Sequence, residues 1–201
     1  MSAAGPPDRQ VSPRRIGDHG TVEVFVADEQ TELIVDVARY RALCHEVLHH
    51  EGVRGDAQMA LVFVDEATIA ELNGTHMGND GPTDVLAFPI DDTYVLAGRS
   101  PDHATRRPPG RDPVLQVGPL LIGDVAVCPA VAARNAPGHR DSYPGHDGSA
   151  EAELDLLVVH GILHILGMDH AQDAERVEMQ AAERRHLHAF RGSVEQRGTA
   201  P

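Results

Sequence analysis

The segment HGILHILGMDH, residues 160–170, decides how the rest of this sequence is interpreted. His160 and His164 are four residues apart in an apolar stretch predicted to be helical, so both side chains leave one face of the helix, a turn apart. Two imidazoles at this spacing can reach one metal ion at about 2.0–2.1 Å. His170 would point away on a continued helix, but Gly167 can take the left-handed conformation that ends a helix and turns the chain back. The segment therefore predicts a three-histidine metal site at a helix end, with one coordination position open to water.

Two other interpretations of this segment are possible, core histidines and a protease metal site. Histidines on an apolar helix can simply be core residues, but a pair at this spacing followed by glycine and a third histidine fits that interpretation poorly. The same spacing occurs in metzincin proteases, in which glutamate follows the first histidine as general base. Gly161 occupies that position and cannot accept a proton. The sequence thus has the metal scaffold of a zincin without its proteolytic base, which argues against peptide hydrolysis unless another carboxylate substitutes.

Composition and charge narrow the class of protein. With 201 residues, 41% of them hydrophobic and 24% charged, the chain has the size and composition of one globular domain with a real core. Its net charge of −14 gives no overall attraction to nucleic acid, so such a function needs a local basic patch or a metal. Two cysteines without a C-x-x-C exclude a cysteine-rich zinc site. The N-terminus lacks a secretory signal and residues 154–168 are too short to span a bilayer, so we expect a cytoplasmic protein without membrane contact.

Hydrophobic periodicity predicts the secondary structure. Strands are expected at residues 21–27, 58–64, 85–90 and 120–127, and helices at 31–50, 65–73, 129–135, 151–167 and 173–190. This order predicts an α+β domain with one mixed sheet covered by helices. Residues 74–84 are expected to be a loop, and residues 91–119 and 136–150 are expected to be exposed loops. The domain is expected to span residues 21–192, between flexible tails at 1–20 and 193–201.

Three segments together resemble the YbeY family of bacterial rRNA maturation factors. Residues 160–170 match the family's H-G-x-x-H-x-x-G-x-D-H pattern. Glu71-Leu72-Asn73, followed by GPTDVLAFP at residues 81–89, matches L-N, a short loop and P-T-[DN]-V-L-S-F-P. Gly123-Asp124-Val125 matches a G-D-I strand. The order and rough spacing of these segments agree from about residue 21 to residue 190.

The resemblance implies a zincin-like α+β fold and a zinc-dependent endoribonuclease specific for single strands. Such an enzyme would act in 3′-end maturation of the small-subunit (16S) rRNA and in ribosome quality control. The resemblance implies one Zn²⁺ per chain on His160, His164 and His170. It also implies that the partners are single-stranded RNA, rRNA and a ribosomal subunit or ribosomal protein, and not DNA.

Further residues are candidates for the site. Thr83 and Asp84 precede a strand. They are expected to form the wall of a cleft, in which Asp84 acts as a base or as the hydrogen-bond partner of a ligand histidine. The alternative is that they only cap a turn. With His160 they form the predicted catalytic set. Supporting or structural roles are expected for Asp169, Gly167, Asn73 and Asp124. Candidate RNA-binding residues are Arg99, Arg106, Arg107, Arg111 and Arg134, although a solvated loop is the favoured interpretation of the first four.

Two departures from the family pattern are visible. Many members carry arginine in the loop after L-N, where this chain has Met77 or, in another alignment, His76. Ala87 replaces the usual serine. The missing arginine leaves an alternative open, a non-catalytic ribosome-associated factor stabilised by zinc, while a zincin-type metalloprotease is less favoured. His45 and His49 also have helical i, i+4 spacing but no third ligand, so we expect them at the surface.

Overall fold

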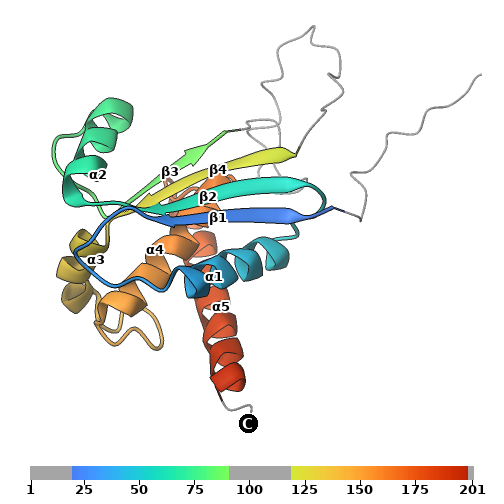
Figure 1. Cartoon of the computed structure of the whole chain (residues 1–201). Coiled ribbons are helices and arrows are strands. Elements are labelled where there is room, and N and C mark those ends of the chain that lie inside the picture. Colours follow the sequence, from blue (N-terminus) through green and yellow to red (C-terminus); the bar gives the residue numbers. More distant parts are fainter. Residues whose placement is uncertain (1–19, 91–118, 199–201) are drawn as a thin grey trace, which may run out of the picture.

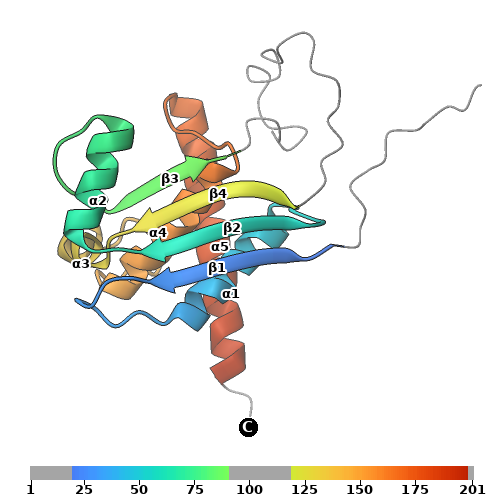
Figure 2. The ribbon, with the colours of Figure 1, turned by 45° about the horizontal axis from the view of Figure 1, so that its top comes forward.

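Four strands form one mixed sheet in the computed structural model, which describes residues 20–90 and 119–198. The strands are β1 (Val22–Asp28), β2 (Ala57–Phe63), β3 (Val85–Pro89) and β4 (Leu120–Val127). Their order across the sheet is β1-β2-β4-β3, with β1, β2 and β4 parallel and β3 antiparallel to β4 (Figure 2). The predicted α+β class with a mixed sheet is therefore confirmed.

Helices cover the two faces of this sheet unequally. They are α1 (Val37–His50), α2 (Glu66–Leu72), α3 (Pro129–Asn135), α4 (Ala150–Ile165) and α5 (Asp173–Gly198). Helices α1, α4 and α5 lie on one face, and α2 lies over one end of the other (Figure 1). The order of strands and helices agrees with the sequence prediction. No helix within the described residues is long and apolar enough to cross a membrane.

The main core lies between the sheet and helices α1, α4 and α5. Strand β2 shows how the sequence creates it, because Ala57, Met59, Leu61 and Phe63 are at most 2% exposed while the residues between them are only half-buried. Side chains of a strand alternate between the two faces, so this pattern directs one apolar row toward the helices. A second, smaller cluster around Ile69 and Leu86 lies on the opposite face, under α2.

Helix α4 runs close to the sheet and carries two of the three predicted ligands. The helix begins after Ser149, whose hydroxyl accepts a hydrogen bond from the Ala152 N–H. Gly161 allows the close approach, because a Cβ there would lie 2.5 Å from Cγ1 of Val125 on β4. The backbone of α4 is thereby held against the strands next to His160.

The structure corrects several predicted boundaries. The first helix begins at Val37 rather than at residue 31, because the Asp36 carboxylate caps it by accepting from the Arg39 N–H at 3.0 Å. Helix α5 continues past residue 190 to Gly198, so residues 193–198, expected to begin a tail, belong to the helix. The tail predicted at residues 1–20 and the loop at 91–119 fall almost entirely outside the described residues.

Two predicted loops also differ from expectation. The segment after α2 begins with a π-helical turn, Asn73–Met77, that ends at Gly78 in the left-handed region. The segment 136–150 begins with a short 3₁₀ helix and is not exposed throughout, because Tyr143 and His146 are 6% and 1% exposed. Its polar composition misled the prediction, since these two rings bury themselves by hydrogen bonding to helix α4.

Candidate metal centre

Helix α4 ends in a turn that brings the third histidine back to the first two. Gly167 has φ of 88°, and its N–H donates to the His164 carbonyl at 2.9 Å. The next residue, Met168, donates to the Leu163 carbonyl at 2.9 Å. These two bonds form a Schellman motif, which satisfies the last carbonyls of the helix and reverses the chain. The role expected of Gly167 is thus visible in its backbone conformation.

The three histidine rings converge at this helix end. Nε2 of His164 lies 3.1 Å from Nε2 of His160, and the ring of His170 lies 5.0 and 5.5 Å from the rings of His164 and His160. One ring nitrogen from each residue lies within 4.8 Å of the others. Within residues 20–90 and 119–198 this is the one group of three or more His, Cys, Asp or Glu side chains that could hold a metal ion.

The local electrostatics suit a metal. Burial lowers the pKa of His164, and the neighbouring His160 and His170 lower it further. Neutral imidazole is the form that donates a lone pair to a metal ion, so this environment favours the binding form. Among the described residues the group consists of three imidazoles, and three protein ligands match the donor set of a catalytic zinc site.

Glu183 is a member of the site that sequence reasoning missed. Its Oε1 lies 2.8 Å from Nδ1 of His160, and its side chain is only 12% exposed. A carboxylate on Nδ1 places the proton there and leaves Nε2, the nitrogen that faces His164, as the donor atom for a metal. The residue lies on α5, 23 positions from His160, so no local spacing pointed to it.

A cavity of about 350 Å³ opens beside the histidines. Its lining includes His160, His170, Glu183 and Asp84. Asp84 lies just before β3, where its carboxylate accepts hydrogen bonds from Asn135 Nδ2 at 3.1 Å and, on the other oxygen, from the neighbouring Thr83 hydroxyl at 3.4 Å. The structure thus brings the predicted catalytic residue Asp84 to the same cavity as two of the predicted ligands, with Thr83 as its hydrogen-bond partner.

Comparison with known proteins shows which family the chain belongs to. The family model described as Endoribonuclease YbeY matches residues 25–191. The chain belongs to the YbeY family. A relative named "Endoribonuclease YbeY" from Salinispora tropica is 41% identical over 167 residues, covering 83% of this chain and 92% of the relative. Relatives of the same name from Frankia alni and Thermobifida fusca are 38% and 37% identical, each over 175 residues, covering 87% of this chain and 86% and 98% of the relatives.

A solved structure supports the fold. The solution structure of TM1509 from Thermotoga maritima aligns with a TM-score of 0.51, covering 87% of this chain and 93% of that chain. At 22% identity this likeness concerns the fold alone.

Two other residues of the YbeY-like segments, Asn73 and Asp169, form hydrogen bonds that hold the backbone near the site. Asn73 is buried and its Nδ2 donates to the Gly81 carbonyl at 2.9 Å, which ties together the two ends of the loop before β3. Asp169 accepts from the backbone N–H of His170 at 2.6 Å and so holds the chain that carries the third histidine.

Asp124, by contrast, is separated from the histidines by the sheet. A Cβ on Gly123 would face Ile165 of α4, and the side chain of Val125 faces Gly161 of α4. Because side chains alternate along a strand, Asp124 points to the other face, where it is exposed opposite Phe88. Of the two roles expected for it, support of the histidine site does not agree with this position, and the structural role stays a prediction.

The basic candidates for RNA contact are only partly described. Arg134 lies in the last turn of α3, and its guanidinium donates to both carboxylate oxygens of Glu66 at 2.6 and 3.2 Å. This ion pair connects α3 to α2. The other candidates, Arg99, Arg106, Arg107 and Arg111, lie outside the described residues.

The packing around Gly161 argues against a zincin-type protease. Gly161 faces Val125 and Val85, so a glutamate there would point into the packed sheet, and the general base of a zincin protease has no room at this position.

The position of the missing family arginine is on the surface. Met77 is 45% exposed in the π-helical turn, and the ring of its neighbour His76 packs edge-on against Phe88, with the ring centroids 5.0 Å apart. The departure from the family arginine therefore lies on an accessible turn.

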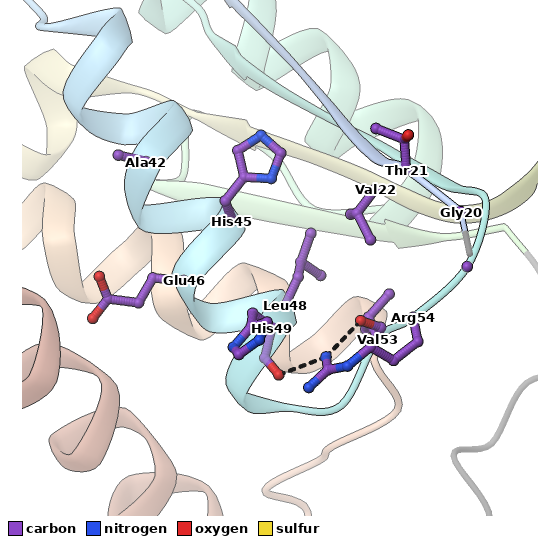
Figure 3. Close-up of a pocket in the computed structure, with 11 residues that line it drawn as sticks. Gly20, Thr21, Val22, Ala42, His45, Glu46, Leu48, His49, Val53 and Arg54 are labelled. Carbon is purple, nitrogen blue, oxygen red and sulfur yellow. Dashed lines mark hydrogen bonds between the residues drawn. The ribbon is translucent and has the colours of Figure 1, made fainter. Parts of the chain in front are cut away.

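A second cavity, of about 610 Å³, lies between α1 and the start of β1 (Figure 3). His45 and His49 line it and are exposed, as expected. Arg54 crosses its end and donates to the carbonyls of His49 and Val53, both at 2.8 Å, so its guanidinium caps the end of α1.

Proposed function

We propose that this chain is a zinc-dependent endoribonuclease specific for single-stranded RNA. It acts in the cytoplasm, in 3′-end maturation of the 16S rRNA and in ribosome quality control, with a ribosomal subunit or ribosomal protein as partner. The observation that carries the proposal is the convergence of His160, His164 and His170 beside a cavity that also contains Asp84, in a member of the YbeY family.

Each residue of the site has a role in this proposal. His160, His164 and His170 hold one zinc ion, and Glu183 keeps Nε2 of His160 directed at it. When bound, zinc polarises a phosphoryl oxygen or lowers the pKa of its water to about 7. Asp84 accepts a proton from the attacking hydroxyl or water, while Thr83 and Asn135 hold its carboxylate in place.

The metal also explains how an acidic protein can act on RNA. The chain has 31 acidic and 17 basic residues, so its overall field repels a polyanion. A cation held by neutral histidines places positive charge where the phosphodiester gains negative charge in the transition state. The site then needs no extended basic surface at the reacting phosphate.

The decisive experiment compares wild type, His164→Ala and His49→Ala on a single-stranded 3′ fragment of rRNA, with bound zinc measured in each preparation. His164→Ala should lose both zinc and cleavage. His49→Ala removes an exposed histidine away from the cluster and should retain both. Cleavage that persists in His164→Ala would contradict the proposal. Zinc binding without cleavage by the wild type would favour the non-catalytic ribosome-associated factor.

A further inference from the structure

The cavity beside the histidine cluster extends along α4 to a second polar group. Its lining includes His139 and Glu153 in addition to His160 and His170. Glu153 precedes His160 by seven residues, or two helical turns, on the same face of α4. Two turns correspond to about 10 Å along the axis. One cavity therefore joins the candidate metal centre to a histidine–carboxylate group two turns away.

Glu153 is fully buried and each of its oxygens is bonded to a histidine. Oε2 lies 2.8 Å from Nε2 of His146, and Oε1 lies 2.7 Å from Nδ1 of His139. His146 accepts a hydrogen bond on Nδ1 from the Gly148 N–H at 3.1 Å, so the proton of its ring is on Nε2 and is donated to Glu153. His146, itself 1% exposed, thus acts as a buried support that fixes the carboxylate.

His139 differs from His146 in facing the cavity. Its side chain is 49% exposed, whereas that of Glu153 is 1% exposed. Because Nδ1 is bonded to the buried carboxylate, Nε2 is the nitrogen on the open side of the ring. Burying a carboxylate is costly in general, so packing alone gives no reason for Glu153 at this position. The arrangement instead holds one imidazole in a fixed orientation at the cavity wall.

We propose that His139, oriented by Glu153, forms a binding subsite for an RNA phosphate that neighbours the scissile one. His139 reaches this cavity from the segment after α3 and bonds to Glu153, two turns of α4 before His160, so its ring lies beside the histidine cluster and not within it. A phosphate bound there would be a neighbour of the one held at the histidine cluster. Nε2 donates to a phosphate oxygen, and Glu153 accepts from Nδ1. The ligand named here rests on the proposed function, but the subsite can be tested by binding alone.

The test measures binding of a non-cleavable 2′-O-methyl RNA oligonucleotide to wild type and His139→Gln by fluorescence anisotropy. Loss of one hydrogen bond to a charged group should raise Kd about tenfold. The matched control is His188→Gln, which changes an exposed histidine on α5 and should bind like wild type. Bound zinc should be unchanged in both variants. An unchanged Kd in His139→Gln would overturn the subsite.

A phosphate scan locates the contact. Single neutral methylphosphonates are placed in turn along the oligonucleotide, and one position next to the scissile phosphate should weaken wild type about tenfold and leave His139→Gln unaffected. Equal losses in both proteins at every position would overturn the proposal. In turnover, KM should rise with little change in kcat, whereas a fall in kcat alone would make His139 an acid–base residue and overturn a binding role. A wild type that binds RNA without cleaving it contradicts only the proposed nuclease function, and one that does not bind RNA contradicts the subsite as well.

Discussion

The carboxylate of Glu183 on α5 lies 2.8 Å from Nδ1 of His160 on α4, so the two C-terminal helices meet at the candidate metal centre. This contact sets the tautomer of one ligand from a helix that contributes no ligand itself. It also means that the packing of α5 against α4 has a direct effect on the geometry of the site.

Glu183→Gln should weaken zinc binding about 10- to 100-fold, because the amide cannot support the basicity of His160 as a carboxylate does. Competition with a chromophoric chelator measures the affinity. Glu178→Gln, at an exposed position of the same helix, is the matched control and should bind zinc like wild type. Equal affinities for Glu183→Gln and wild type would show that the contact has no influence on the metal.

Gly161→Ala should lower the free energy of unfolding by about 1–3 kcal/mol, because the new Cβ would lie 2.5 Å from Cγ1 of Val125. Urea unfolding measures the effect. Gly192→Ala on α5, where a Cβ meets nothing within 4 Å, is the control and should be neutral or stabilising by up to about 1 kcal/mol. Adding Val125→Ala to Gly161→Ala should show a coupling of about 0.5–3 kcal/mol, and strict additivity would argue against the clash.

The free energy of unfolding should fall as the pH drops below about 7, in part because of His186. Burial lowers the pKa of this buried side chain from its usual 6.5, while Glu51, 2.7 Å away, acts in the opposite direction, and His50 and Arg185 also lower it. The unfolded chain then binds a proton that the folded protein does not, so the stabilisation is complete above pH 6.5 and is lost as the pH falls toward the lower folded value.

Urea unfolding of wild type and His186→Gln between pH 5.5 and 7.5, at intervals of about half a unit, measures this contribution. The difference in slope should not exceed about 1.4 kcal/mol per pH unit, the limit for one proton. His188→Gln, on the exposed side of α5, should keep the wild-type slope. The interpretation fails if His186→Gln keeps it too.

Met77→Arg should strengthen RNA binding, since it adds a positive charge on an exposed turn of an acidic protein. If the new side chain contacts a phosphate, the slope of log K against log salt should steepen by about 0.7 for a single strand. Met77→Gln, polar but uncharged, should leave the slope unchanged. A gain in cleavage would identify the arginine as the group this chain lacks. If neither RNA binding nor cleavage changes, the turn does not contact RNA.

Local patterns were sufficient to predict the convergence of the three histidines and the order of strands and helices. The i, i+4 spacing of His160 and His164 and the helix-ending Gly167 act within a few residues, so their geometry follows from the helix itself. The late start of α1 also had a local signal, because Asp36 is a typical N-cap residue that the hydrophobic periodicity ignored.

The sequence by itself therefore determined the three-histidine segment, the mixed α+β class and the relation to YbeY proteins. Only the tertiary structure decided that Glu183 supports His160, that Asp84 lies at the same cavity, and that Glu153 joins His139 to the buried His146. These contacts join residues from different elements. Their partners are set by how α4 and α5 pack against each other and against the sheet, and neither helical nor strand periodicity records that packing.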